Sequence, residues 1–532
     1  MEMPAFNTFL HSLIFSALAL LWPLSTSGAD LSVGKPGIAA ETDSTAKSPG
    51  RSQEVPPVVH SRQGDRSPGI PGSLVIENIG KKQQFNWSDK ATLDRDIFSP
   101  KSANYHPSGK KYYINSLEGC KTVVYDAETH AKSVVIHHNF PSGQGALWAA
   151  PSEFYPFTHY ADGASRAFSG KPVEAAFSHG GRYLWVPYYR RTFDINAQDP
   201  SAVAVIDTRS DSIVRMFETG PLPKMIAVSP DSHYVAITHW GDNTVGLIDI
   251  SDKDMARWHH LKPLVAGSKL KLDFPLDKEI DRDKHSGLKL RGTVFTPDGK
   301  YLLVSAMGGP LQVFDVSAME WLGSVNSAYG VRHLVIINGQ LYGSQNIAGT
   351  VIGIPLDSVT DAAARARAAG TKVIAVKGWR TCKVGGGART LEPSPDGKYL
   401  FVACNSASKI CVVDAAKMQM VDTIRVDSYP VGLAVSPLGD QVLVTSQGRN
   451  HHGGNAVNIF RIERPDYHPA PLPDSDEPAD IQEDAEPLPG EPEAVADPES
   501  KWPFAFLVMG LTVLLGAFVC ALIWQSNRKK RK

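Results

Sequence analysis

Short apolar runs, each entered through a tight polar turn, repeat through the middle of this chain of 532 residues. The clearest copy has the turn Ser394-Pro-Asp-Gly, followed by the run Tyr399–Cys404. Pro, Asp and Gly favour tight turns, while aromatic and β-branched residues favour strands, so each copy predicts a turn that leads into a strand. A unit that recurs in this way buries its apolar faces by stacking on other copies of itself. Weaker copies of the turn begin at His106, Ser178, Ser229, Thr296, Ile337 and Ser436.

The best-preserved unit, residues 387–427, has the strand pattern of one propeller blade. Four short antiparallel strands within about forty residues are typical of such a blade. The strands are predicted at 388–392, 399–404, 410–414 and 421–426. In several units an Asp ends the third strand, and we expect it to stabilise the turn that follows; these residues are Asp207, Asp249, Asp315 and Asp414.

Seven turns predict an all-β fold, a β-propeller of seven four-stranded blades over residues 73–464, with six or eight blades as alternatives. The last unit shows three strands and ends at 457–462. Its fourth strand could come from Ser73–Ile79, the first β-like run of the mature chain. Closure by a strand from the other end of the domain would cover both free sheet edges.

The repeats resemble those of the YVTN family of seven-bladed β-propellers. Leu400–Cys404 and Leu443–Thr445 are the counterparts of the strand motif that names this family, and the resemblance covers residues 74–464. It implies a superfamily that includes lactonase-like propellers, the haem-binding propeller of haem-d-type nitrite reductases (cytochrome-d1-like) and quinoprotein amine dehydrogenase subunits. The fold alone does not choose between a binding scaffold and an enzyme.

The two ends of the chain predict a secreted protein with a membrane anchor. The apolar run 13–24 and the small residues before Ala29 resemble a secretory signal, residues 1–29, with an uncleaved membrane anchor as the alternative. Residues 502–524 are predicted to form a transmembrane helix, because about 21 uncharged residues span a hydrocarbon core of about 30 Å. The basic tail, 525–532, is expected to stay in the cytoplasm, which leaves the propeller outside it, in the periplasm or at the cell surface.

Two linkers flank the predicted propeller. Residues 30–72 are rich in Ser, Pro and Gly and are expected to be a disordered leader. Residues 465–501 are expected to be an acidic, Pro-rich stalk, since 465–500 contain nine prolines, twelve acidic residues and no Lys or Arg. The formal net charge of −1 therefore hides an acidic stalk beside a basic propeller. We expect no nucleic acid partner for a propeller outside the cytoplasm.

The chain carries no motif for a covalently bound haem or for a familiar metal site. The patterns C-x-x-C-H, H-E-x-x-H and G-x-S-x-G are absent, as are paired cysteines with zinc spacing. We therefore predict no cofactor, with haem or metal as the alternative. Cys404 and Cys411 flank one hairpin loop and could form a disulfide in an oxidising compartment or stay as two buried thiols.

Aligned on their turns, five of the seven units carry a basic residue six positions before the second residue of the turn. The departures are Val173, which precedes Glu174, and Val431. The first strand of a blade is innermost, so five cations near the channel entrance would repel one another unless an anion lay between them. The alternative is that these side chains turn into the gaps between blades and pair with Asp residues of adjacent units. The five residues are Lys101, Lys224, Arg291, Arg332 and Arg389.

Loops on the same face as these entrances offer further ligand-binding residues, because recognition usually resides in loops on a rigid scaffold. The loops between second and third strands supply Arg190, His239, Trp240, Arg449 and His451. Two long insertions between blades, about 139–171 and 266–287, are expected to emerge there too. The first insertion is aromatic, with Trp148, Phe154, Tyr155, Phe157, His159 and Tyr160. The alternative metal or haem ligands are His239, His333, His451 and His452.

The sequence thus predicts a single-pass, membrane-anchored propeller outside the cytoplasm that binds a ligand or partner and lacks catalysis of its own. The expected partner is an anionic small molecule, or a protein or glycan of the cell envelope, beside the inner or cell membrane itself. One alternative is an enzyme or redox-cofactor propeller, either haem-binding or a lactonase-like hydrolase. The other alternative is a structural cell-surface protein, which leaves the basic positions without a purpose. Scattered candidates for a lactonase metal cluster are Glu174, Asp242, Asn243 and Asn405.

Overall fold

Short strands dominate the structure, a computed structural model that describes residues 57–85, 92–141, 144–160, 166–271, 280–448 and 453–472. All of these residues belong to one compact unit, Met1–Glu477. The second unit, Pro478–Lys532, lies outside the described residues, and so do the predicted signal 1–29 and the predicted membrane helix 502–524. Within the described ranges, no helix has the length and apolar character needed to span a bilayer.

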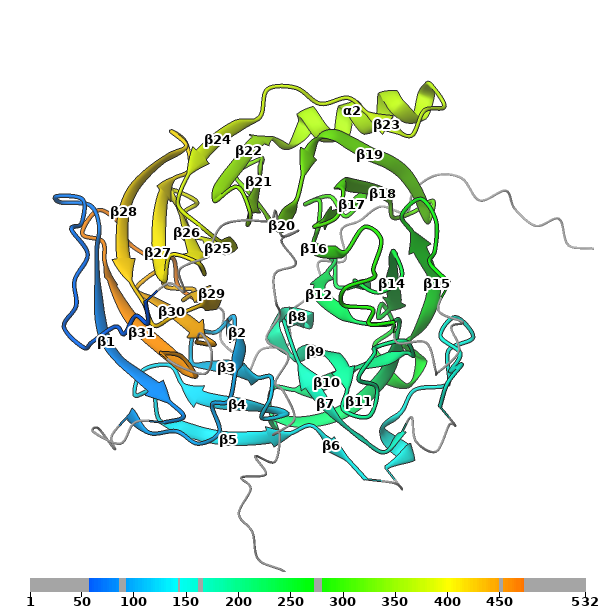
Figure 1. Ribbon diagram of the computed structural model, residues 1–532, viewed down its shortest axis with the longest axis horizontal. Coiled ribbons are helices and arrows are strands. Elements are labelled where there is room, and N and C mark those ends of the chain that lie inside the picture. The colour runs from blue at the N-terminus through cyan, green and yellow to red at the C-terminus, as the bar shows by residue number, and fades with distance from the viewer. Residues whose placement is uncertain are drawn as a thin grey trace, which may run out of the picture. The chain divides into compact units, whose positions relative to one another are not determined.

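The strands form seven sheets whose innermost strands surround one axis (Figure 1). The first blade contains β2 (Pro100–Tyr105), β3 (Lys111–Ser116), β4 (Lys121–Asp126) and β5 (Lys132–His137). In the second blade the inner strand is split, and the strands are β6 (Asn139–Phe140), β7 (Phe168–Pro172), β8 (Ala176–Ser178), β9 (Tyr183–Arg191), β10 (Ser201–Asp207) and β11 (Ser212–Thr219). The third contains β12 (Pro223–Val228), β13 (Tyr234–His239), β14 (Thr244–Asp249) and β15 (His259–Val265).

The remaining blades complete the ring. The fourth contains β16 (Leu290–Phe295), β17 (Tyr301–Ala306), β18 (Pro310–Asp315), β19 (Glu320–Tyr329) and the short parallel strand β23 (Val373–Ile374). The fifth contains β20 (Val331–Ile337), β21 (Gln340–Gln345), β22 (Thr350–Pro355) and β24 (Arg380–Lys383), and the sixth β25 (Ala388–Pro393), β26 (Tyr399–Cys404), β27 (Lys409–Asp414) and β28 (Gln419–Arg425). The seventh contains β29 (Pro430–Val435), β30 (Gln441–Ser446), β31 (Ala456–Glu463) and β1 (Val75–Gln83). The predicted seven-bladed propeller of four-stranded blades is therefore confirmed.

The apolar core lies between the blades. Within the described residues the buried side chains fall into seven clusters, and each cluster joins two neighbouring blades. One cluster, for example, places Phe401 of β26 against Phe460 of β31. Since a blade has no core of its own, each one is stable only when it is stacked on its neighbours.

The repeated turn closes the first hairpin of a blade through a shared set of hydrogen bonds. In the sixth blade, Ser394 Oγ donates to Asp396 Oδ1 at 2.6 Å and accepts from the Tyr399 amide at 3.0 Å, while Gly397 adopts a φ of +68°. The fourth blade repeats the arrangement with Thr296 and Asp298, at 2.5 Å. The Ser or Thr and the Asp are therefore needed for the turn, and the Gly for its left-handed residue.

A strand from the start of the domain closes the seventh blade. β1 pairs antiparallel with β31 from Val75↔Glu463 to Gln83↔Ala456. The sequence predicted this outer strand at Ser73–Ile79, and the pairing confirms it. The ring is thereby closed by residues that lie almost 400 positions apart, and the outer edge of β31 is covered.

The chain before β1 is bound to the propeller as well, from residue 57 onward. Asp427, whose side chain is fully buried, accepts from the Ser61 amide at 3.0 Å and from Lys81 Nζ at 3.2 Å. The Val59 amide donates to Ser428 Oγ at 2.7 Å. Residues 57–72 form part of the leader 30–72, which the composition predicts to be disordered; the structure gives them defined contacts with the connection between β28 and β29.

Within the described residues, an α-helix interrupts the β pattern between β22 and β23. α2 (Leu356–Ala368) follows β22, and it packs against β19, β22 and β23 with a buried face that includes Val359, Ala362, Ala363 and Ala366. The repeat pattern did not predict this helix. It covers the outer side of the fourth and fifth blades (Figure 1).

Candidate functional site

The five basic residues of the repeat share one structural position, a β-bulge at the start of an inner strand. In β2 the pairing with β3 jumps from Pro100↔Ser116 to Ser102↔Asn115, which leaves Lys101 as the extra residue. The same shift skips Lys224 in β12 and Arg332 in β20, and it skips Arg291 and Arg389 with one neighbour each in β16 and β25. A bulge re-aims a side chain that regular pairing would hold in the sheet.

The departures from the basic pattern occupy the same position. Val431 is the bulged residue of β29. In the second blade the inner strand breaks between β7 and β8, so Val173 and Glu174 lie in the break. The predicted alignment of the units on their turns therefore corresponds to a structural equivalence in all seven blades.

Four of the five basic bulges are fastened by the blade before them. Thr238 Oγ1 of the third blade donates to the Arg291 carbonyl of the fourth at 2.8 Å. Ser305 makes the same bond to Arg332 O at 3.4 Å, and Ser344 to Arg389 O. Thr445 closes the ring by donating to Lys101 O at 3.2 Å. The main-chain carbonyl of each of these four basic residues thus accepts a hydrogen bond from a Ser or Thr of the preceding blade, and these donors do not belong to the repeated turn.

Arg291 reaches a blade that is not its neighbour. Its Nη2 lies 3.8 Å from Glu174 Oε1, and the two side chains are 4% and 10% exposed. Arg291 belongs to the fourth blade and Glu174 to the second, so the pair meets inside the ring. Arg291 thus has a partner in a blade that is two positions away along the ring.

A second carboxyl group of the inner strands lies near this pair. Glu392 of β25 has its pKa raised to about 8, first because it is buried and second because Glu174 is negatively charged. The same environment lowers the pKa of His333 to about 4, through burial and then through the positive charge of Arg291. His333, which is 8% exposed, therefore stays neutral at physiological pH.

Lys224 defines a second cluster, at the mouth of the channel. Its Nζ lies 3.2 Å from Asp283 Oδ1 and stands over the rings of Tyr189, at 3.9 Å from the centroid, and Trp240, at 4.9 Å. Arg190 Nη2 lies 3.3 Å from the other carboxylate oxygen of Asp283 and donates a hydrogen bond to Tyr189 Oη at 2.7 Å. Asp283 comes from the insertion 266–287, which therefore meets the predicted entrance. We call Tyr189, Arg190, Lys224, Trp240 and Asp283 the mouth cluster.

The register places this cluster on the face that the sequence indicated. Pro223 at the start of β12 pairs with His239 at the end of β13, and Thr244 at the start of β14 pairs with Val265 at the end of β15. Starts of inner strands, loops between second and third strands, and ends of outer strands thus share one face. The repeated turn lies at the opposite end of the same strands.

His239 is not available as a ligand-binding residue. Its side chain is fully buried, its Nε2 accepts from the Gly220 amide at 3.0 Å, and its Nδ1 lies 2.7 Å from Thr244 Oγ1. Burial lowers its pKa to about 3, so the ring stays neutral. Thr244 in turn donates to Asp242 at 2.7 Å. The prediction treated a buried structural histidine as a surface donor, because the position of His239 beside a loop can be inferred from the sequence whereas its burial cannot.

The aromatic insertion at 139–171 also packs where we expected an open recognition surface. Trp148 forms a bridge to Met216 of β11, the outer strand of the second blade, and Tyr155 is buried against His239 and His260. Phe157 lies 4.9 Å from the buried guanidinium of Arg191. The described part of this insertion therefore contributes apolar packing along the blade edge.

Other predicted positions have structural roles or lie elsewhere. The third-strand aspartates accept backbone amides of their own turns, as predicted, at 2.9 Å for Asp207, Asp249, Asp315 and Asp414. Cys404 and Cys411 are buried free thiols with sulfur atoms 3.6 Å apart, so their disulfide stays a prediction. Arg449, His451 and His452 lie outside the described residues. Among the residues that the structure does describe, no three His, Cys, Asp or Glu side chains group together in a way that could hold a metal ion.

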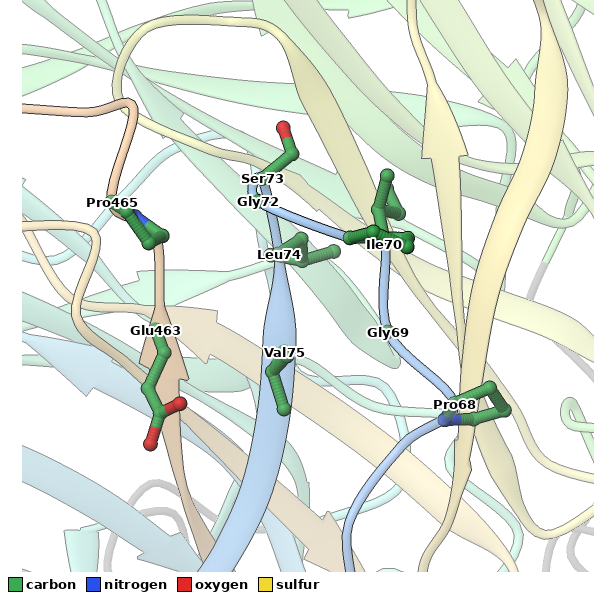
Figure 2. Close-up of a pocket in the computed structure, with 10 residues that line it drawn as sticks. Pro68, Gly69, Ile70, Gly72, Ser73, Leu74, Val75, Glu463 and Pro465 are labelled. Atoms are coloured by element: carbon green, nitrogen blue, oxygen red, sulfur yellow. The ribbon is translucent and has the colours of Figure 1, made fainter.

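A small pocket of about 140 Å³ lies far from both clusters, in the turn that leads into β1 (Figure 2). Pro68, Ile70, Leu74 and Val75 line it with Glu463, whose carboxylate pairs with Arg66 at 3.0 Å. β1 is the outermost strand of its blade, so this pocket belongs to the ring closure and not to the channel.

Sequence reasoning located Lys224, Arg190 and Trp240 but missed Tyr189, Asp283 and Glu392. Tyr189 adjoins Arg190, and an aromatic residue beside a loop cation was a usable signal. Asp283 lies among Asp281, Arg282 and Lys284, where nothing in the sequence distinguishes it. Glu392 appeared as the polar end of an apolar strand, and only the ring geometry brings it near Glu174.

Comparisons with known proteins bear on the fold. No protein-family model matches this sequence, and no curated protein is significantly similar to it. A chain of hydrazine synthase from Kuenenia stuttgartiensis is 13% identical with a TM-score of 0.46, over 71% of this chain and 99% of that one. The β-propeller domain of Cps50 (Swd1) from Myceliophteria thermophila is also 13% identical with a TM-score of 0.46, over 68% of this chain and 96% of that one. The strand topology described above remains the basis for the fold.

Proposed function

We propose that this propeller is a binding module whose channel mouth holds an anionic group of a ligand or partner. The observation that supports it is the mouth cluster, where Lys224 and Arg190 approach the two oxygens of one carboxylate, at 3.2 and 3.3 Å. Charged hydrogen bonds of this kind are about twice as strong as neutral ones, so they suit the recognition of an anion. The rings of Tyr189 and Trp240 add flat apolar surface on the same side.

The proposal concerns the mouth and leaves a different role to the deeper cations. Arg291 is neutralised by Glu174, and Lys101, Arg332 and Arg389 are at most 5% exposed. Lys224 is buried to the same degree, at 1%, but it lies beside Arg190 and Asp283, which are 11% and 20% exposed and give an incoming group a route to it. The mouth cluster is thus the part of the basic pattern that an incoming group can approach.

Calorimetric titration of the full chain with succinamate and with inorganic phosphate tests this function. We expect binding that weakens as salt rises, and that is lost in Lys224→Met. Lys284→Met is the matched control, because Lys284 lies in the same insertion, is 66% exposed and is 3.6 Å from Asp281. Equal binding by wild type, Lys224→Met and Lys284→Met would remove the mouth cluster as the site.

We also propose that the module is membrane-anchored, with the propeller outside the cytoplasm. The support is the uncharged segment 502–524, followed by the basic tail 525–532. Fractionation of cells that express the full chain, with and without residues 502–532, tests the anchor. We expect membrane association in the first case and its loss in the second, and an unchanged distribution would contradict the proposal.

Kinship with the YVTN propellers is part of the same proposal. It is supported by the repeated turn and by Leu400–Cys404 and Leu443–Thr445. An alignment of sequences related to this chain would test it, since the turn and these strand motifs should then recur at all seven positions.

A further inference from the structure

Asp283 is bound at the mouth through two different groups. Its carboxylate lies within 3.2–3.3 Å of Lys224 and Arg190, and its main-chain carbonyl accepts from Trp240 Nε1 at 3.2 Å. The three donors come from three places in the fold, namely β12, β9 and the residue that follows β13. The mouth therefore binds Asp283 through both its main-chain carbonyl and its side-chain carboxylate, which are the two ends of a four-carbon unit.

The turn that carries Asp283 is built by its own local bonds. Asp281 Oδ1 accepts the Asp283 amide at 2.9 Å, and its carbonyl accepts the amides of Lys284, at 3.1 Å, and His285, at 2.9 Å. The Arg282 amide donates to Asn196 O at 3.0 Å. The carboxylate of Asp283 is thus not required to form the turn, and its bonds to the mouth cations are additional.

We propose that Asp283 is an internal occupant of the mouth site, which an external ligand must displace, and that this ligand carries the same two groups. Its chemical class is a carboxylate joined to a carbonyl oxygen through a short chain, as in a succinamate or an aspartyl residue of a peptide. This inference rests on the proposed function and adds to it both a ligand class and a device that lowers affinity until displacement occurs.

The size of that effect follows from how often the internal group leaves. When the competent state is a fraction of the population, the apparent dissociation constant rises by the inverse of that fraction. Occupancy of the mouth by Asp283 for about nine-tenths of the time raises it about tenfold. Removing the charge of Asp283 without changing its shape then releases the site.

Calorimetry on the full-length chain tests the inference, with succinamate as the free acid and N-acetyl-aspartate amide as the peptide-like probe. We expect Asp283→Asn to bind the better of the two probes about tenfold more tightly than wild type. Asp252→Asn is the matched control and should bind like wild type, since Asp252 pairs with Arg257 at 3.2 Å on an exposed turn. The preferred probe distinguishes a small-molecule source from a peptide source.

The outcomes distinguish failure of the internal-occupant inference from failure of the anion site. Equal affinity in Asp283→Asn and wild type overturns the internal-occupant inference and leaves the anion site standing. Binding of neither probe nor phosphate by any variant overturns both. Tighter binding that persists in the double variant Lys224→Met/Asp283→Asn would place the ligand elsewhere and also overturn the inference. Asp283→Ser serves as a second variant, with the same expected gain, and a thermal melt of each protein confirms that it is folded.

Discussion

Arg291 and Glu174 belong to blades that are not neighbours in the ring, yet Arg291 Nη2 lies 3.8 Å from Glu174 Oε1. The third blade separates them along the ring, so their contact joins two blades that are not neighbours. The pair ties together two inner strands, one with a bulge and one with a break. It also explains how a ring rich in cations is tolerated at this level, because the break in the second blade supplies an opposite charge.

Removing Arg291 should destabilise the propeller through the carboxylate that it leaves behind. A buried charge without its partner costs about 3 kcal/mol, so Arg291→Gln should lower the free energy of unfolding by about that amount. The double variant Arg291→Gln/Glu174→Gln should recover most of the loss. Urea unfolding of the four proteins measures the coupling, and strictly additive effects would contradict a direct interaction.

Glu392 should make stability depend on pH between about pH 4.5 and 8. Its pKa rises from 4.5 to about 8 in the folded protein, so the protonated form is favoured by folding. The stabilisation is complete below pH 4.5 and is lost as the pH rises through 8. Glu392→Gln should therefore melt at the same temperature as wild type at pH 5 and at a higher temperature at pH 9. Glu128→Gln, on an exposed turn, should show no such divergence, and parallel melting curves for Glu392→Gln would refute the assignment.

Two glycines of the repeated turn allow strain to be separated from contact. Gly397 and Gly299 have φ angles of +68° and +69°, so an Ala at either pays about 1 kcal/mol for the left-handed conformation. A Cβ on Gly299 meets nothing within 4 Å, whereas one on Gly397 would lie 2.3 Å from Asn338 Nδ2 of the fifth blade. Gly397→Ala should thus lose more stability than Gly299→Ala in chemical denaturation. Equal losses would show that Asn338 moves aside freely.

Asp427 should be the most sensitive single position of the ring closure. Its buried carboxylate accepts from Ser61, Lys81 and Asn458, which belong to the leading segment, β1 and β31. Asp427→Ala leaves Lys81 without that partner and should cost about 3 kcal/mol. Limited proteolysis should then cut near residue 60 earlier than in wild type. Asp252→Ala, at an exposed pair, should change stability much less than Asp427→Ala, and a similar loss in both variants would argue against a special role for Asp427.

The fold was predictable because its signal is repeated. The Ser394 turn and its relatives recur seven times, and each copy supports the others, so the strands and even the closure by Ser73–Ile79 could be read in advance. α2 has no counterpart in the other units and therefore escaped the repeat pattern. The leader was assigned by composition, which does not register that Asp427 and Ser428 bind residues 59–61.

The site was predictable only in part. The offset from the turn found the bulges, because a bulge at a fixed register needs a fixed number of residues before the turn. It could not separate Arg291, which pairs with Glu174 of the second blade, from Lys224, which pairs with Asp283 of the insertion, since both have the same local sequence position. His239 was misjudged for a related reason, because burial depends on residues such as Tyr155 and Gly220 that lie far away in the chain.

The segment that follows β31 is bound to the sixth blade by ion pairs. Arg464 makes two bonds to Asp396, at 3.0 and 2.7 Å, and Asp466 lies 2.5 Å from Lys398 Nζ. Both partners lie in or beside the repeated turn of the sixth blade, while β31 belongs to the seventh. A pull applied further along the chain is therefore carried first by this clamp and is shared between two blades. Force applied beyond residue 466 therefore acts on these ion pairs before it acts on the pairing of β31 with β1 and β30.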